Sequence, residues 1–363
     1  MPSSTFSSNA LRLSLRSWAV LAVVLGAIFL VFPRAWSRAQ RFEAGTDYRF
    51  PYETSNDYWM YRQWCDRAAQ QHPYLALGDS VIWGQYAGNN QTLTHYLNAS
   101  SGREGEDFAN IAIDGIHPIA MEGLVRYYGA SMEGRKVLIN LNLLWMSSPM
   151  QDFQGDQEFR FNHPRLVPQV VGRFACYKPN LAEVMSVEAE RHIEFFSCAK
   201  HINISCFANM PFSDWTLEHP YESPLTALGT SLPGTDVGPQ SKPVDWKKRG
   251  MGGQDFAWVP LSESNQWRAF TRTLDLLREK GASVFVLFVP INPYLQTDDS
   301  RARGEAQAKD AKAWLEGARL PYYCADGLQS VQYADASHPL ADGYAEIARR
   351  LRECSAFKEW MNK

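Results

Sequence analysis

The chain has 363 residues, of which 45% are hydrophobic and 21% charged, so it can bury a sizeable core in one large domain or two modest ones. Its formal net charge is −3, and without a basic excess no nucleic-acid partner is predicted. Aromatic residues are abundant, with 12 Trp, 16 Tyr and 19 Phe, and most of them are expected in the core.

An uncharged run near the N-terminus is the first predicted element. Arg12 and Arg16 precede residues 17–32, which read SWAVLAVVLGAIFLVF, and Arg34 follows closely. This run lies near the lower limit for a membrane span and is slightly long for the core of a signal peptide. A buried core helix is disfavoured at the extreme end of a chain, before a polar stretch. The segment therefore predicts membrane insertion or export.

Two fates of this segment are open. Its length and the nearby Arg34 favour an uncleaved signal anchor, with residues 1–41 forming a cytoplasmic tail and anchor around the hydrophobic core 17–32. The small residues of Ser37-Arg38-Ala39 allow cleavage near Ala39 and secretion instead. Arginines flank the run on both sides, so charge does not set its orientation. In both cases we expect the rest of the chain to be periplasmic or otherwise extracytoplasmic.

Apolar runs and helical patterns alternate along the rest of the chain. Residues 42–72 are polar and aromatic and predict a juxtamembrane lead-in. Beyond them, short apolar runs are typical of strands buried on both faces of a parallel sheet. These runs are residues 74–77, 108–113, 137–144, 283–289 and 320–324. Helical patterns lie at residues 117–128, 263–280, 301–316 and 342–352.

This alternation predicts the fold class. Strands that alternate with helices indicate a three-layer α/β/α sandwich with a mostly parallel sheet of about five strands. We assign it to residues 73–363. Residues 146–260 break the rhythm, and their second half is rich in Pro, Gly, Ser and Trp. Because a long irregular stretch in a compact domain is usually functional or disordered, we predict an insertion that covers or shapes the site.

Cysteines and histidines give no sign of a metal site. No CxxC pair occurs, and the histidines lack spacings such as His-Glu-x-x-His, so neither a metal nor another cofactor is predicted. An even number of cysteines in an exported protein permits disulfides, and Cys198 and Cys206 are the closest pair. Six scattered thiols are the alternative.

A serine at the end of the first apolar run is the first candidate for chemistry. Ser80 follows Gly78 and Asp79 directly after the predicted strand, where open α/β sheets place their sites. Near the C-terminus, Asp335 and His338 lie three residues apart in a predicted loop. A serine hydroxyl is a poor nucleophile unless a base accepts its proton and a third group orients the base. These three residues can supply all three roles.

Four ordered blocks resemble the SGNH, or GDSL-like, hydrolases. The first is the Gly78-Asp79-Ser80 turn, and the second has the form Asn-x-x-x-x-Gly from Asn110 to Gly115. The third carries an asparagine after a strand, matched best by Asn142. The last is Asp-x-x-His at Asp335 and His338, with His-Pro and Gly-Tyr after it. The resemblance covers residues 74–352 and implies a flavodoxin-like sandwich.

The resemblance also implies roles for these residues. Ser80 would be the nucleophile, His338 its general base and Asp335 the group that orients the base. The backbone N–H groups of Ser80 and Gly115, with the Asn142 side chain, would form the oxyanion hole.

The third block departs from the family pattern. The family usually has Gly-x-Asn-Asp there, whereas this chain has Asn140-Leu141-Asn142-Leu143, so Asn140 is an alternative to Asn142. An asparagine that only satisfies backbone groups at a strand end is also possible. Asp114 and His117 are interpreted as turn and helix-start residues.

Family membership does not choose the acyl chemistry. We expect an esterase or O-acyltransferase that acts on acyl groups, with acetyl the first choice, of cell-envelope or extracellular polysaccharide. Exported acyltransferases with this layout usually work beside a membrane-bound O-acyltransferase, which is the expected partner. Tryptophans can stack on sugars, although core packing is the usual role of any one of them. The candidates are Trp145, Trp215, Trp246 and Trp258. The alternatives are an anchored lipase or small-ester hydrolase, and a non-catalytic binding or assembly protein on a decayed fold.

Overall fold

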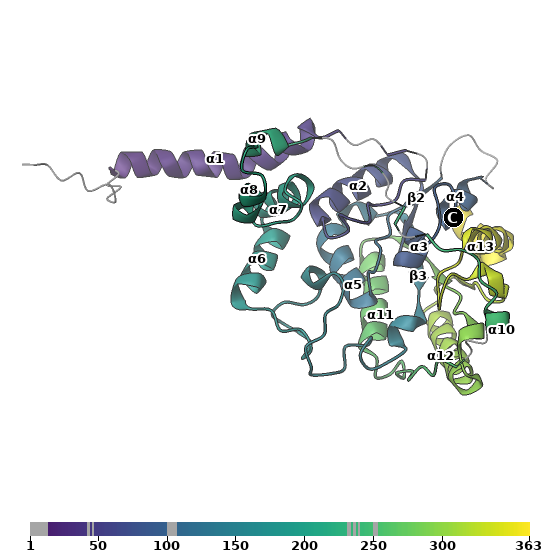
Figure 1. The fold of residues 1–363 in the computed structure, drawn as a ribbon. Coiled ribbons are helices and arrows are strands. Elements are labelled where there is room, and N and C mark those ends of the chain that lie inside the picture. Colours follow the sequence, from purple (N-terminus) through teal and green to yellow (C-terminus); the bar gives the residue numbers. More distant parts are fainter. Residues whose placement is uncertain are drawn as a thin grey trace, which may run out of the picture.

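The computed structural model describes residues 14–41, 44–45, 47–99, 107–230, 234, 237–238, 240–249 and 253–363. Residues 1–13 of the predicted cytoplasmic tail and parts of the predicted lead-in and insertion lie outside these ranges. The described residues form a three-layer α/β/α sandwich with a long insertion, from which one N-terminal helix projects (Figure 1).

The central sheet has five parallel strands in the order β2-β1-β3-β4-β5. All five predicted apolar runs contain a strand. The strands are β1 (Tyr74–Leu77), β2 (Phe108–Asn110), β3 (Lys136–Leu141), β4 (Ser283–Phe288) and β5 (Tyr322–Cys324). β3 ends three residues before the apolar run does, because the Asn142 side chain accepts a hydrogen bond from the Leu144 N–H and caps a short 3-10 turn, Leu143–Met146.

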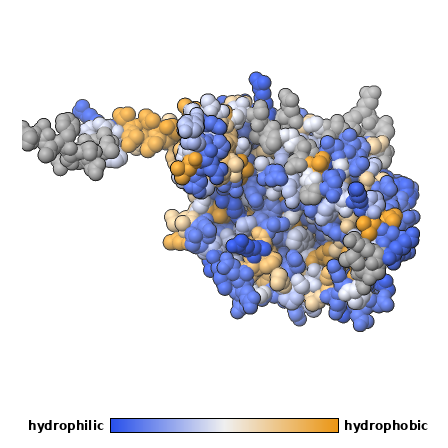
Figure 2. All heavy atoms as spheres, viewed as in Figure 1, coloured by the Kyte–Doolittle hydropathy of each residue, from blue (hydrophilic) through white to orange (hydrophobic). Residues whose placement is uncertain are grey.

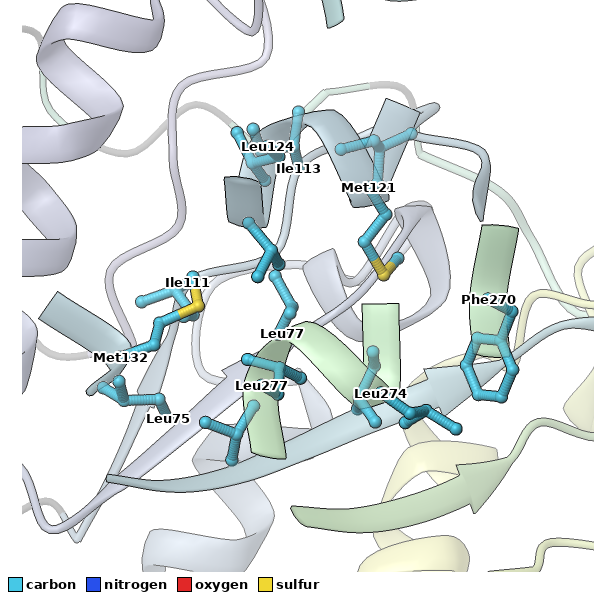
Figure 3. Packing of buried hydrophobic residues seen from close by; sticks show 14 of the residues in the cluster. Leu75, Leu77, Ile111, Ile113, Met121, Leu124, Met132, Phe270, Leu274 and Leu277 are labelled. Carbon is cyan, nitrogen blue, oxygen red and sulfur yellow. The ribbon is translucent and has the colours of Figure 1, made fainter. Parts of the chain in front are cut away.

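One face of the sheet is covered by four helices. They are α2 (Tyr58–Gln71), α5 (Pro118–Tyr128), α11 (Asn265–Glu279) and α12 (Asp298–Gly317). Alternate strand residues such as Leu75 and Leu77 point into this layer, where they meet Leu274 and Leu277 of α11 (Figure 3). The core therefore follows from the two-residue period of the strands and the amphipathic face of α11.

The other face is covered by α3 (Ser80–Trp83), α4 (Leu93–Ala99), α13 (Ala341–Glu353) and α14 (Ser355–Asn362). Here Phe285 of β4 packs against Phe357 and Trp360 of α14. Three of the four predicted helices begin and end within two residues of the prediction, and α12 begins three residues earlier, at Asp298.

The insertion carries its own helices. They are α6 (Leu181–His192), α7 (Glu194–Cys206), α8 (Phe212–Glu218), α9 (Pro224–Ala227) and α10 (Trp246–Arg249). The insertion packs against α5 of the sandwich. Gly123 of α5 lies so close to the Leu166 carbonyl of the insertion that any side chain at position 123 would overlap this carbonyl. A small cluster around Phe153 and Val167 buries the rest of this contact.

Helix α1 (Leu15–Ala39) is the only helix of the described residues that is long and apolar enough to cross a membrane, and it fits a membrane anchor or a signal sequence. The chain that follows it is part of the domain. Phe50, Tyr61 and Trp64, within the predicted lead-in 42–72, are fully buried in the main core. The packed domain thus extends further towards the N-terminus than residue 73.

The expected Cys198–Cys206 disulfide is wrong, and all six cysteines are free thiols. Both residues lie on α7, eight positions apart, which separates their Cα atoms by about 12 Å. A disulfide needs Cα atoms within about 7 Å of each other.

Candidate active site

Ser80 lies at the turn from β1 into α3. The Asp79 side chain caps this short helix by accepting from the Val81 N–H at 2.9 Å, and Ser80 is the first helical residue. A Cβ at Gly78 would overlap the Asn140 side chain and lie 2.5 Å from Ile82 Cγ1, so only glycine allows this close approach. The turn thereby holds Ser80 at the carboxyl end of β1, and the residue is 6% exposed.

The structure brings the three expected reacting residues together. His338 Nε2 lies 2.7 Å from Ser80 Oγ, and His338 Nδ1 lies 2.8 Å from both carboxylate oxygens of Asp335. Ser80 and His338 are separated by 258 positions in the chain. With Nδ1–H donated to Asp335, Nε2 carries a lone pair towards the serine hydroxyl, as nucleophilic catalysis requires.

The Asp335–His338 loop is held from several sides. The Ser337 and His338 N–H groups both donate to Asp335 Oδ1, at 3.0 and 2.9 Å. Asn292, after β4, donates from Nδ2 to the Asp335 carbonyl and from its backbone N–H to the Ala336 carbonyl. The carboxylate is therefore fixed on the histidine before any substrate arrives.

Electrostatics in this pair favour a charged imidazolium. Burial alone would lower the pKa of His338, but the hydrogen bond and negative charge of Asp335 outweigh it and raise this pKa above its usual value. Burial likewise would raise the pKa of Asp335, yet the hydrogen bond and charge of His338 lower it. Asp335 therefore stabilises the imidazolium that His338 becomes when it accepts a proton.

The site lies where the strand order reverses. β1 is flanked by β2 and β3. From β1 the chain continues to β2 on one side, and from β3 it continues to β4 on the other side, so the order reverses between β1 and β3. Ser80 follows β1 and Asn142 follows β3, so both lie at the crevice that such a switch point leaves at the carboxyl ends of the strands.

Asp79 organises this crevice. Its carboxylate accepts from Asn140 Nδ2 at 2.8 Å, Asn142 Nδ2 at 2.9 Å and Trp145 Nε1 at 3.0 Å, as well as from the Val81 N–H. Asn140 Oδ1 also accepts from the Asp79 N–H. Both asparagines considered for the third block are thus hydrogen-bonded to the turn that carries Ser80, and the Asn142 amide also approaches Ser337 Oγ, at 3.5 Å.

Gly115 lies in the second block with a φ of +69°, a conformation that favours glycine. Asn162 of the insertion packs against its Cα, where a side chain would overlap the Asn162 amide. Within the described part of the chain, neither the Gly115 nor the Ser80 N–H donates a hydrogen bond. These two amides therefore remain free to bind an oxyanion.

Two residues beside the triad were missed by the sequence analysis. Tyr86 has a φ of +67° and packs edge-on against His338, with ring centroids 5.5 Å apart. Asp114 lies in a turn, as predicted, and burial raises its pKa to about 6, against the opposing charge of His338. Its Oδ1 is buried without a hydrogen-bond partner among the described residues. Neither residue belongs to a periodic pattern. The one sequence signal that could have found them is their closeness to Ser80 and Gly115 along the chain.

Other candidates have structural roles. His117 caps α5 through its Nδ1, as predicted, and its pKa falls to about 3 because it is buried. Trp215 and Trp246 are buried, which leaves no ring face for a sugar. Trp258 instead lines a pocket of about 380 Å³ with Phe288 and Arg301, at the carboxyl ends of β4 and β5.

Among the described residues, no group of three His, Cys, Asp or Glu side chains is placed to hold a metal ion. Comparison of the chain with protein-family models and with curated protein sequences gives no match.

Proposed function

We propose that the protein is a serine-dependent esterase or O-acyltransferase of the SGNH type, which forms an acyl-enzyme on Ser80. The observation that carries this proposal is the hydrogen-bonded chain from Ser80 Oγ through His338 to Asp335, at 2.7 and 2.8 Å. A decayed site would have no reason to keep three residues from two distant segments in this register.

The reaction has two half-steps. His338 Nε2 accepts the Ser80 hydroxyl proton while Oγ attacks the ester carbonyl, and the tetrahedral intermediate collapses as His338 returns the proton to the leaving alcohol. The acyl group is then bound to Oγ. In the second step water or a sugar hydroxyl gives its proton to His338 and attacks the acyl-enzyme, and Ser80 recovers its proton when the product leaves. Hydrolysis and transfer differ only in this acceptor.

The developing oxyanion has three candidate donors. The Ser80 and Gly115 amides are unengaged among the described residues, and the second N–H of the Asn142 amide faces only the long contact to Ser337. Asn140 exchanges two hydrogen bonds with Asp79 and is better suited to fixing the turn. Loss of one such donor typically costs about 2.7–4 kcal/mol of barrier.

The setting favours an extracytoplasmic substrate. We place the sandwich outside the cytoplasm, with α1 as an uncleaved anchor, and we propose acetyl esters of envelope or extracellular polysaccharide as its substrates. A membrane-bound O-acyltransferase is the partner that would supply or receive acyl groups. The support is the N-terminal apolar helix, the first half of which projects from the domain that carries the site (Figure 1).

The test uses the full chain in detergent. We expect hydrolysis of a chromogenic acetyl ester and labelling of Ser80 by a fluorophosphonate, both lost in Ser80→Ala. Rates on esters of increasing chain length and on acetylated polysaccharide separate this proposal from an anchored lipase. Equal activity in the two proteins, with no label on Ser80, would contradict it.

A further inference from the structure

The membrane-type helix α1 is packed against the insertion. Phe29 of α1 stacks on Phe195 of α7 with ring centroids 4.1 Å apart, and it meets Phe196 edge-on at 5.7 Å. Phe32, one turn further along α1, also contacts Phe195. These α1 residues belong to the apolar run itself, so α7 lies beside a segment that would be inside the bilayer.

The end of α1 is also fixed to the domain by hydrogen bonds. Ser37 donates to the Gln63 side chain of α2, and Gln63 donates to Gln40. Gln40 contacts His201 of α7, whose other ring nitrogen bonds Asp57. A helix held in this way is no flexible tether, and its direction in the membrane sets the direction of the whole domain.

The length of the apolar run agrees with this arrangement. Residues 17–32 span about 24 Å, whereas the hydrocarbon core of a bilayer is about 30 Å thick. Arg34, Arg38 and Arg41 follow on the domain side, are exposed and have no carboxylate partner among the described residues. If Arg34, the first charge after the run, lies at the phosphate level, Phe29 lies about 8 Å deeper along a helix perpendicular to the membrane. Phe195 and Phe196 then reach hydrocarbon depth.

The surface around this contact is apolar. Figure 2 shows apolar residues along the projecting part of α1 and in patches on the adjoining end of the domain. Figure 1 shows α7 beside the second half of α1, which it contacts. Ile193 is 43% exposed and Phe196 38%. Further exposed apolar side chains of the insertion helices are Leu181, Met185, Phe212, Leu217 and Leu225. Met185 and Phe196 line one open hollow between α6 and α7, and exposed apolar side chains that gather in this way mark a binding surface.

One charged group limits the depth of insertion. Glu194 is exposed in the same turn as Phe195, and a carboxylate stays at the headgroup level. Only the side chains that pack beside α1, such as Phe195 and Phe196, therefore enter the hydrocarbon layer of the membrane. This is the behaviour of an interfacial segment, which buries one face about 5–10 Å below the headgroups.

From the aromatic contact, the short apolar run and the exposed side chains, we infer that the α6–α7 corner at Ile193–Phe196 is a second membrane-contacting element, inserted into the lipid beside α1. Together with α1, this corner holds the catalytic domain against the bilayer in one fixed orientation. The inference rests on the proposal that α1 is retained as an anchor.

The experiment places photoreactive p-benzoylphenylalanine at Phe196 in the full chain, reconstituted in vesicles of phosphatidylethanolamine and phosphatidylglycerol. Val331 is the matched control position, since it is 42% exposed but lies on the Ser330–Gln332 turn beside α13. After irradiation, mass spectrometry should find several-fold more lipid adduct at position 196 than at position 331.

The same irradiation in membranes of expressing cells tests whether a partner protein, and not lipid, covers position 196. Equal adduct at both positions, a protein adduct at position 196 in place of lipid, or a mature chain that begins after Ala39 would each overturn the inference. Fluorophosphonate labelling of Ser80 in the same samples reports on the proposed catalysis separately. Loss of the lipid adduct while Ser80 is still labelled would refute the membrane contact of the α6–α7 corner and leave the proposed catalysis untouched.

Discussion

The buried carboxyl of Asp114 makes the stability of the fold depend on pH. Its pKa rises from 3.8 to about 6 because burial disfavours the charged form. The folded state therefore binds more protons than the unfolded state between these two values, and stability falls as pH rises through this window. Asp114→Asn removes the titration and leaves a side chain of similar size.

The magnitude follows from the two pKa values. A shift of one pKa unit is worth about 1.4 kcal/mol, so the ionised carboxylate costs about 3 kcal/mol at neutral pH. At about pH 4.5 most folded molecules hold the proton and the cost is only about 1 kcal/mol. The difference in unfolding free energy between Asp114→Asn and the natural chain should therefore change by about 2 kcal/mol, in favour of the variant, from about pH 4.5 to about pH 7.5.

The assay is denaturant unfolding of the full chain in detergent, followed by tryptophan fluorescence at both pH values. Asp156→Asn is the control, because Asp156 is an exposed carboxylate of the insertion. The comparison is between pH values, so a pH-independent cost of the asparagine cancels. A difference that stays constant with pH, or that favours the natural chain at higher pH, would refute the reasoning.

Three further outcomes are expected. The kcat/KM for an acetyl ester should rise with pH with an apparent pKa above 6.5, because Asp335 raises the pKa of His338 and only the neutral imidazole accepts the Ser80 proton; a flat profile would contradict this. Asp335→Asn should lower kcat by about 10⁴ and shift that apparent pKa down, since burial of the imidazole remains; an unchanged profile argues against the pairing. Gly123→Ala should cost about 1–3 kcal/mol of stability, because its Cβ would overlap the Leu166 carbonyl. Gly317→Ala, with open space around it at the end of α12, should leave stability unchanged or raise it by up to about 1 kcal/mol. Equal unfolding midpoints of the two variants would contradict the close contact at Gly123.

The strands and the places of the three candidate residues Ser80, Asp335 and His338 could be predicted because their signals are local. The strands that end at Leu77 and Phe288 are buried on both faces, which leaves a continuous hydrophobic run in the sequence. Ser80 and the Asp335–His338 pair stand at strand ends and loops, where few other reasons exist for those residues in that spacing. The parallel sheet places these residues at one edge, and the loop after β5, held by Asn292, closes the remaining distance to 2.7 Å.

The remaining features depend on contacts that leave no periodic pattern. Asn140 and Asn142 could not be separated in sequence because both reach the Asp79 carboxylate from the same strand end. The partly buried position of Asp114 follows from the packing of Asn162 and His163 of the insertion on the turn that contains Gly115. That contact joins segments about fifty residues apart, through a stretch without a recognisable repeat.

The role of Ser80 can be tested most directly by trapping its acyl-enzyme. The full chain is mixed with a chromogenic acetyl ester, quenched in acid within the first turnovers and digested for peptide mass spectrometry. The account predicts one acetyl group on Ser80, absent from Ser80→Ala and strongly reduced in His338→Ala. Ester turnover with no acetyl group on Ser80, or acetylation that is equal in the His338 variant, would contradict it.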